Sequence, residues 1–348
     1  MMHDDDFENY LRKMLSNSIS SSNPSQNAKN KARKLSPSYF DDFKNELLIK
    51  YDGKTLDDVM DCRICQGDFG EALRITKTEK IDFRLDDNNF RNQINSNLKL
   101  LPKIGLKTEQ NLKEKGYGTI ESLKDHDRYG DMASKFLAEI EDMSYMEIID
   151  LLDRNKYSKK CRDNILKSIS LTDRENFKFM DIETKGLSNV PIILIGVAEI
   201  KKDKIVASQY FLRDYAEEAS IIEAYLTHLD EDSVHVTFNG KTFDIPFIKN
   251  RCRYNRIDAN LDLPHLDLMY FAKNLWADDL PNCQLQTIER EIFGINRVDD
   301  VPGQYIPGYW DSYLENDNIG PVVPIIEHNV QDIISLASFL EKMYRDVN

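Results

Sequence analysis

Short apolar runs divided by turns dominate the second half of the chain. Four of them read as strands, because apolar side chains occupy both of their faces: residues 177–184, 191–199, 204–212 and 234–238. A short polar turn separates the second run from the third, which predicts an antiparallel pair. Helical patterns alternate with these runs, at about 217–229, 270–276 and 285–293. The alternation predicts an α/β domain over residues 173–348.

The last predicted element is a helix that begins near Pro324. An apolar stripe at helical spacing marks its core-facing side: Ile326, Val330, Ile333, Ile334, Ala337 and Leu340. His328 and Asp332 are four positions apart, so they are neighbours on one flank of this helix. A carboxylate on a partly apolar flank needs a partner, and a capped or ion-paired aspartate is the alternative to a functional one.

The first half of the chain has a different pattern. Residues 16–34 are rich in Ser, Asn and Lys and hold almost no apolar side chains, which predicts a disordered, low-complexity N-terminus over residues 1–35. Residues 36–172 are predicted to form a mainly α-helical region, with a helix after Pro37. Alternation within residues 72–85 adds a small β-hairpin to this region.

Two acids end the strand at 177–184. Asp181 and Glu183 are two positions apart, so their side chains share one face of the strand, about 7 Å apart along it. Two carboxylates that point together from a sheet repel each other and lose hydration, so they need a cation. Hard oxygen ligands suit Mg²⁺ or Mn²⁺. A strand that merely ends in a charged turn is the alternative.

A third acid follows another strand. Asp244 is predicted at the N-terminus of a helix just beyond the strand at 234–238, where α/β sheets place their sites. Asn239, in the loop between them, is a candidate substrate contact. Together with Asp332, these separated acidic motifs favour a metal site over unrelated charged turns.

Residues 98–123 combine helical patterns with two interruptions. Pro102 and Gly105 break the first pattern, and a new helix is predicted from about Thr108 to Gly116. This segment resembles a helix–hairpin–helix unit, in which hairpin amides and the next helix N-terminus hold a backbone phosphate. Lys103 stands where many such hairpins have a glycine. An ordinary helical hairpin in a small α-bundle is the alternative.

The distribution of charge helps to decide between a phosphate-binding hairpin and an ordinary helical hairpin. The chain of 348 residues has a formal net charge of −14, which argues against a protein built to coat nucleic acid. Two local basic clusters nevertheless occur, at 99–115 and 154–167, and they predict a phosphate-binding face over residues 98–167. The candidate phosphate contacts are Lys103, Gly105, Lys107, Lys159 and Lys160. Solvated helix surfaces are the alternative.

Cysteines and apolar runs indicate the compartment. Five cysteines at irregular spacing suit a reducing cytoplasm. Cys62-x-x-Cys65 has no second pair to complete a zinc site, so two ordinary thiols are the favoured interpretation. The N-terminus is acidic, unlike a signal peptide, and no apolar run is long enough to span a membrane. A cytoplasmic protein without a membrane segment is expected.

Five segments of the second half carry a family resemblance: FMDIETKGL (179–187), VTFNGKTFDIPFIKNR (236–251), HLDLMYFAKNLW (265–276), CQLQTIEREIFGINRVDDVPG (283–303) and HNVQDIISLA (328–337). In this order they resemble the ribonuclease H-like 3′–5′ exonucleases of the DnaQ/DEDD superfamily, in particular its YprB-type branch. The resemblance implies a mixed five-stranded sheet flanked by helices, preceded by the mainly α-helical region.

The resemblance also implies chemistry. Asp181, Glu183, Asp244 and Asp332 would hold two ions, Mg²⁺ or Mn²⁺, and His328 would orient or deprotonate the attacking water. His-x-x-x-Asp combines the spacing of the family's tyrosine class with the side chain of its histidine class, which leaves the role of His328 open. A 3′–5′ exonuclease acting on a single-stranded 3′ end of DNA or RNA is the favoured function. A silent nucleic-acid-binding scaffold and a structure-specific endonuclease are alternatives.

Overall fold

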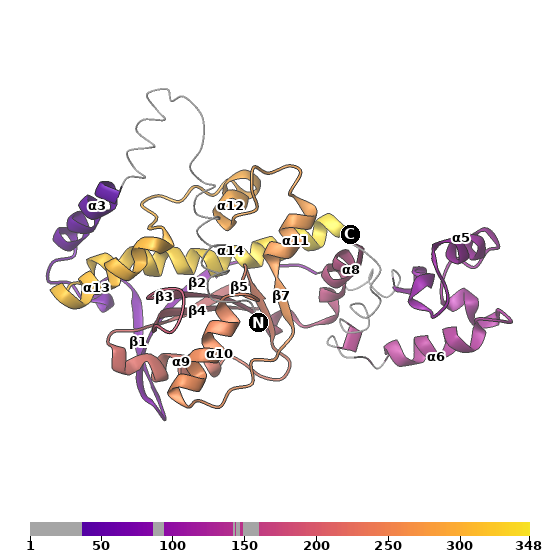
Figure 1. Ribbon diagram of the computed structural model, residues 1–348, viewed down its shortest axis with the longest axis horizontal. Helices are drawn as coiled ribbons and strands as arrows, with labels where there is room; N and C mark the ends of the chain where they lie inside the picture. The colour runs from indigo at the N-terminus through magenta and orange to yellow at the C-terminus, as the bar shows by residue number, and fades with distance from the viewer. Residues whose placement is uncertain (1–36, 86–93, 142, 144–146, 149–159) are drawn as a thin grey trace, which may run out of the picture. The chain divides into compact units, whose positions relative to one another are not determined.

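A computed structural model describes residues 37–85, 94–141, 143, 147–148 and 160–348 (Figure 1). The chain divides into two compact units, residues 1–50 and 51–348. The described part of the first unit is helix α3 (Pro37–Lys50), in which Phe40 and Leu47 are buried. This confirms the helix predicted after Pro37, whereas the predicted disordered segment at 1–35 lies outside the described residues.

A seven-stranded mixed sheet organises the second unit. Its strand order is β1-β2-β5-β4-β3-β6-β7. The strands are β1 (Asp61–Gly67), β2 (Gly70–Lys80), β3 (Phe177–Thr184), β4 (Ile192–Lys201), β5 (Lys204–Phe211), β6 (Val234–Thr237) and β7 (His265–Asp267). The β3, β6 and β7 strands run parallel, and all the other neighbours pair antiparallel. The mixed sheet and the β4–β5 antiparallel pair are confirmed.

The domain at 173–348 contributes the five predicted strands, β3 to β7, and the hairpin from the first half adds two more strands to the same sheet. Strand β2 pairs with β5 from Leu73 opposite Phe211 to Lys80 opposite Lys204. The hairpin also begins earlier than predicted, since β1 starts at Asp61. Strand β1 reads DCRICQG, with little alternation, because most of its side chains are exposed at the sheet edge. Strand β1 pairs locally with β2, with Gly67 opposite Gly70 across a short turn, and its exposed side chains leave no period-2 signal.

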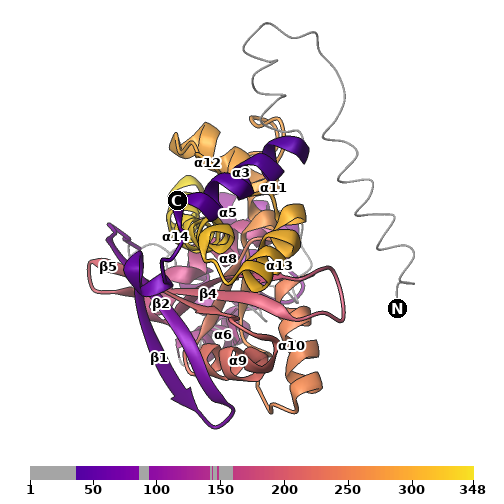
Figure 2. The same cartoon turned by 90° about the vertical axis from the view of Figure 1, so that its left-hand side faces the viewer.

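Helices cover both faces of the sheet. Figure 2 shows α14 (Val323–Val347) on one side and α9 (Glu218–Leu226) with α10 (Asp244–Asn255) on the other. Helix α14 packs against β3, β4 and β5, and it also contacts α11 (Leu268–Leu275) and α8 (Lys160–Ser168). Two further helices, α12 (Leu285–Phe293) and α13 (Ile306–Asn316), lie in the connection that leads to α14. No helix among the described residues has the length and apolar character needed to cross a bilayer.

The helical segment before β3 has a core of its own. It contains α5 (Leu106–Glu114) and α6 (Gly130–Glu141), whose neighbouring turns bury Leu98, Leu101 and Ile120. The hairpin before α5 is tight, and Lys103 takes a left-handed conformation with φ of 67°. This is a backbone conformation that favours glycine, which explains why hairpins of this kind often carry one there.

Candidate active site

Strand β3 presents two of the predicted acids. Asp181 and Glu183 alternate with the buried Met180 and Ile182, so both carboxylates leave the sheet on the same side. Asn329 on α14 donates a hydrogen bond from Nδ2 to Asp181 Oδ2 at 2.9 Å. The central strand and the last helix are therefore joined at the first acid.

Helix α10 brings in the third acid. Asp244 is the first residue of α10, and its Oδ1 accepts a hydrogen bond from the backbone N–H of Ile182 at 3.1 Å. Ile182 lies between the two acids of β3, so this bond fixes the start of α10 against the strand. The prediction that Asp244 begins a helix beyond β6 is confirmed.

The last helix supplies Asp332 and His328. They lie one turn apart on α14, and His328 Nε2 is 3.4 Å from Asp332 Oδ2. The same Nε2 atom is 3.8 Å from Glu183 Oε1. The structure thus brings all five predicted residues of the site together, from β3, α10 and α14.

Burial and mutual repulsion shift the pKa values of these acids upward. Burial, followed by the charges of Asp244, Glu183 and Asp332, raises the pKa of Asp181 well above its usual range. Burial raises the pKa of Glu183 to about 8, although the charge of His328 opposes the shift. Burial also raises the pKa of Asp244 to about 7. Carboxylates in such surroundings are stabilised as anions only by a nearby cation.

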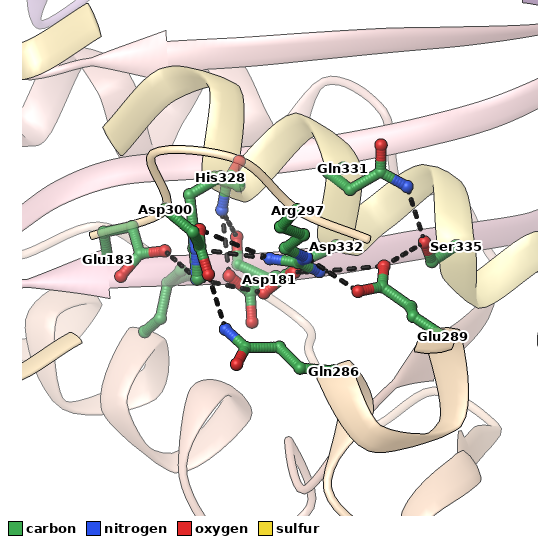
Figure 3. Close-up of polar contacts among 12 residues, drawn as sticks. Asp181, Glu183, Gln286, Glu289, Arg297, Asp300, His328, Gln331, Asp332 and Ser335 are labelled. Carbon is green, nitrogen blue, oxygen red and sulfur yellow. Dashed lines mark hydrogen bonds and ion pairs between the residues drawn. The ribbon is translucent and has the colours of Figure 1, made fainter. Parts of the chain in front are cut away.

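An arginine supplies such a cation. Arg297 forms an ion pair with Asp332 through Nη2, and it holds Glu289 with Nε and Nη2 at 2.6 and 2.8 Å (Figure 3). The Glu289 side chain is fully buried and also accepts a hydrogen bond from Ser335 Oγ at 2.5 Å. A buried carboxylate with this many donors holds the guanidinium in one place.

A further acid lies against the histidine. Asp300 Oδ1 is 2.5 Å from His328 Nδ1, and Gln286 Nε2 donates to Asp300 Oδ2 at 2.6 Å (Figure 3). The pKa of His328 is raised to about 9, because the charge of Asp332 and the hydrogen bond to Asp300 outweigh its burial. The imidazole is thus enclosed by carboxylates on two sides.

Glycine 196 makes room for the asparagine of the site. Gln209 Nε2 donates to Asn329 Oδ1 at 2.9 Å, which leaves Asn329 Nδ2 to face Asp181. A Cβ atom at Gly196 would lie 2.1 Å from Asn329 Oδ1. Only glycine at this position of β4 therefore lets Asn329 approach the strand so closely.

The donor set has the chemistry that Mg²⁺ and Mn²⁺ require, which is several hard carboxylate oxygens in a desolvated pocket. However, no group of three or more His, Cys, Asp or Glu side chains in the described part of the chain is arranged so that it could hold a metal ion. Three of the four carboxylates have a protein donor instead: Asn329 for Asp181, Ile182 N–H for Asp244 and Arg297 for Asp332. The residue types fit a metal, and metal binding would require these side chains to rearrange.

Asn239, the predicted substrate contact, stabilises the turn that precedes α10. It has a left-handed conformation with φ of 71°, and its Oδ1 accepts a hydrogen bond from Thr242 Oγ1 at 2.9 Å. Asp267 accepts from the N–H groups of Asn239 and Lys241 at 2.8 and 3.1 Å. These bonds shape the turn that leads to Asp244, and a contact of Asn239 with substrate stays a prediction.

The candidate phosphate contacts are described in part. Lys103, Gly105 and Lys107 are exposed around the start of α5. Two other lysines of the basic cluster, Lys99 and Lys113, form ion pairs with Glu109 at 3.5 and 3.2 Å. Lys159 lies outside the described residues, and Lys160 enters them only with its backbone, as the first residue of α8.

The Cys62-x-x-Cys65 motif does not form a site. Both cysteines lie on β1, opposite Ile75 and Ala72 of β2, and an odd spacing on a strand places them on opposite faces. Burial raises the pKa of the Cys62 thiol to about 11, so it is protonated at neutral pH. Both thiols are free. These findings support two ordinary thiols over a metal pair.

Sequence reasoning missed four residues that support the site: Glu289, Arg297, Asp300 and Asn329. Arg297 and Asp300 belong to a Pro-, Gly- and Asp-rich loop, where charged residues are expected in solvent anyway. The one available signal was that Asn329 directly follows His328 in the last motif.

Known proteins are similar to this chain in sequence. The family model of the RNase H superfamily matches residues 178–344. The chain is similar to the Bacillus subtilis protein named uncharacterized protein YprB, with 29% identity over 180 residues, which cover 50% of this chain and 43% of that protein. It is also similar to a DNA polymerase of Methanocaldococcus jannaschii, with 24% identity over 213 residues, which cover 49% of this chain and 12% of the polymerase.

The matches therefore span less than half the length of either relative. The family-model match spans the strands and helices that carry the five site residues, and the comparisons confirm the predicted resemblance and the RNase H-like fold. The chain resembles the YprB-type branch of the RNase H superfamily, and its residues 178–344 form the RNase H-like domain.

Proposed function

We propose that this chain is a divalent-metal-dependent nuclease, and specifically a 3′–5′ exonuclease that acts on a single-stranded end of DNA or RNA. The observation that carries the proposal is the convergence of Asp181, Glu183, Asp244 and Asp332 in one buried cluster, in which burial and neighbouring charges raise the pKa values of Asp181, Glu183 and Asp244. A fold that concentrates desolvated carboxylates loses stability unless a cation joins them.

Asp181, Glu183, Asp244 and Asp332 would hold two Mg²⁺ or Mn²⁺ ions in this site. Such ions polarise the phosphate, lower the pKa of water and stabilise the leaving oxygen. His328 faces the same acids through Nε2, at 3.4 Å from Asp332 and 3.8 Å from Glu183. With a pKa of about 9, the imidazole is protonated at neutral pH while these acids hold no cation. Cations held by the acids would lower this pKa and leave Nε2 in place to take a proton from the attacking water.

We propose that the helical segment before β3 holds the nucleic acid. Lys103, Gly105 and Lys107 expose two positive charges and a backbone turn at the start of α5. Helix starts favour anions, and contacts of this type hold a phosphate without reading bases. Since the whole chain has a net charge of −14, a local basic contact would offset the repulsion of a polyanionic substrate.

The test is incubation of the purified full chain with single-stranded DNA, duplex DNA and RNA, each labelled at the 5′ or the 3′ end. Reactions contain Mg²⁺, Mn²⁺ or EDTA. A 3′–5′ exonuclease produces a ladder of shortened products from 5′-labelled strands and releases single nucleotides from 3′-labelled strands. Asp181→Asn serves as the negative control, because it removes one carboxylate at constant shape.

Other patterns would replace the proposal. Discrete internal products from both labels would show an endonuclease. Binding of labelled strands without any cleavage, for both metals, would show a nucleic-acid-binding protein that retains the fold. Cleavage that persists in Asp181→Asn would point to a contaminating nuclease or to a different site.

A further inference from the structure

We propose that Asp300 and His328 form a carboxylate–imidazole dyad, in which Asp300 is the positioning residue that fixes His328 as the base for water. This inference rests on the proposed function. In the step concerned, His328 Nε2 takes a proton from water, the water oxygen forms a bond to phosphorus, and the P–O3′ bond breaks. The leaving 3′-oxygen departs with the electron pair of that bond.

The contact between the two side chains defines which nitrogen is free. Asp300 Oδ1 lies 2.5 Å from His328 Nδ1. A carboxylate only accepts hydrogen bonds, so Nδ1 must carry the hydrogen in this contact. When cations bound by the acids let the imidazole become neutral, its lone pair is on Nε2, which is the atom that faces Asp332 and Glu183. The carboxylate thus selects the tautomer whose basic nitrogen points into the acidic cluster.

Arg297 does not compete for the same nitrogen. Its Nη1 lies 3.2 Å from His328 Nδ1, but a guanidinium only donates, and Nδ1 already donates to Asp300. Arg297 Nη1 is also 3.8 Å from Asp300 Oδ1. The arginine therefore acts on the dyad through the negative charge of Asp300, which it attracts toward the histidine.

Two contacts with helix α12 hold the loop that carries Asp300. Gln286 of α12 donates to Asp300 Oδ2 at 2.6 Å. Arg297, at the start of the same loop, is anchored by the fully buried Glu289 of α12. Both contacts come from one helix, so α12 sets the position of the carboxylate relative to α14. A base held at one orientation needs no reorganisation when the proton moves.

The geometry also explains how a histidine functions at this spacing. His328 is on α14, whose helical backbone leaves its side chain few rotamers, and the observed rotamer places Nε2 beside Asp332 and Glu183. The contact of Nδ1 with Asp300 stabilises this rotamer and the tautomer together. Asp300 is 28 positions away in the sequence and reaches Nδ1 only through the fold.

The experiment is a double-mutant cycle in the full chain, with steady-state kinetics on a labelled single strand in Mn²⁺. Asp300→Asn should lower kcat by roughly 10²-fold, within the range of general-base catalysis, and leave KM unchanged. In the His328→Ala background, Asp300→Asn should cause no further loss, because the imidazole that Asp300 positions is gone. Asp300→Glu, which keeps the carboxylate, should recover part of the rate.

Asp299→Asn is the matched control. Asp299 is exposed in the same loop and has a left-handed conformation with φ of 57°, which asparagine also tolerates. The kcat of Asp299→Asn should therefore match that of wild type. Circular dichroism and Mn²⁺ titration calorimetry test whether each variant keeps the fold and the metal affinity. If Asp300→Asn does not fold, Asp300→Ser enters the same cycle.

The outcomes distinguish failure of the Asp300–His328 dyad from failure of the proposed nuclease function. An unchanged kcat in Asp300→Asn overturns the dyad, as does an equal loss in both backgrounds or an effect on KM alone. A wild-type protein that hydrolyses none of the substrates overturns the proposed function and the dyad with it. Activity in wild type that is abolished in Asp181→Asn but unaffected by Asp300→Asn overturns the dyad alone.

Discussion

His328 Nε2 lies 3.4 Å from Asp332 Oδ2, one helical turn away on α14. The two residues are four positions apart, which is close to one helical turn, so both side chains leave α14 toward β3. Glu183 is 3.8 Å from the same nitrogen. A histidine at this position faces the acids directly, which supports its proposed role as the base for water.

Replacement of one buried carboxylate should separate function from stability. Asp181→Asn keeps the shape of the side chain and removes a charge that Asp244, Glu183 and Asp332 repel. We expect nuclease activity to fall to background, while the metal-free protein becomes no less stable. Mn²⁺ should raise the melting temperature of wild type but much less that of the variant, because binding to the folded state stabilises it.

Thermal unfolding with and without Mn²⁺ measures this effect. Asp203→Asn is the control, because it removes an exposed acid from the turn between β4 and β5. Activity of Asp181→Asn within a few-fold of wild type would rule out the proposed metal site.

Removal of the histidine should affect the rate alone. His328→Ala removes the candidate base and leaves the four acids in place. We expect kcat to fall by roughly 10²–10⁴-fold, as is usual for the loss of a general base, with Mn²⁺ affinity unchanged. Single-turnover kinetics and metal titration measure the two quantities. A near-normal rate would show that His328 only packs against the acids.

Gly196→Ala tests the support of Asp181. The added Cβ would lie 2.1 Å from Asn329 Oδ1, so Asn329 must move and its hydrogen bond to Asp181 is disturbed. We expect a loss of stability of roughly 1–3 kcal/mol from overpacking and a reduced kcat. Gly308→Ala is the control, because a Cβ at this position of α13 meets no atom within 4 Å. Urea unfolding measures stability, and equal effects of both changes would contradict the prediction.

The basic hairpin should act on affinity rather than on chemistry. Lys103→Glu and Lys107→Glu reverse two exposed charges near the start of α5. We expect KM to rise at unchanged kcat, and the slope of log K against log salt to flatten by roughly 0.7–0.9 for each lost phosphate contact. Lys135→Glu on α6 is the control for added negative charge. An unchanged salt slope would mean that the hairpin does not contact phosphates.

These substitutions are preferable to deletion of the first half of the chain. Removal of residues 1–170 would also remove β1 and β2, and β2 pairs with β5 over most of its length. The sheet would lose two strands and expose a new edge. A loss of activity in such a truncated protein would therefore not report on phosphate binding.

A buried histidine should make the fold sensitive to acid. His235 on β6 is fully buried beside His265, and neither of its ring nitrogens has a hydrogen-bond partner among the described residues. Burial, together with the charge of Lys249, lowers its pKa to about 4. The unfolded chain, with a histidine pKa near 6.5, therefore binds more protons than the folded protein between these two values.

Stability should accordingly fall as the pH drops from about 6.5 toward 4, by roughly 3 kcal/mol from this group. Urea unfolding of wild type and His235→Leu at a series of pH values measures it. The variant should lose less stability over this window, since it has no proton to bind at that position. Equal pH dependence of the two proteins would disprove the assignment.

Local patterns in the sequence predicted much of the fold and the five central site residues. Strand β3 has apolar side chains on both faces and ends in two acids, and α14 carries an apolar stripe at helical spacing. Both signals arise from the periodicity of a single element, which every residue of that element reports. Asp181, Glu183, Asp244, Asp332 and His328 were predictable because they lie at strand ends, at a helix start or one turn apart.

The supporting residues depend on contacts between distant segments. Asp300 meets His328 across 28 positions, Arg297 meets Asp332 across 35, and β2 pairs with a strand from the other half of the chain. A charged residue in a loop has the same local pattern whether it faces water or a buried partner. Tertiary packing therefore decided which loop charges enter the site and that the sheet has seven strands rather than five.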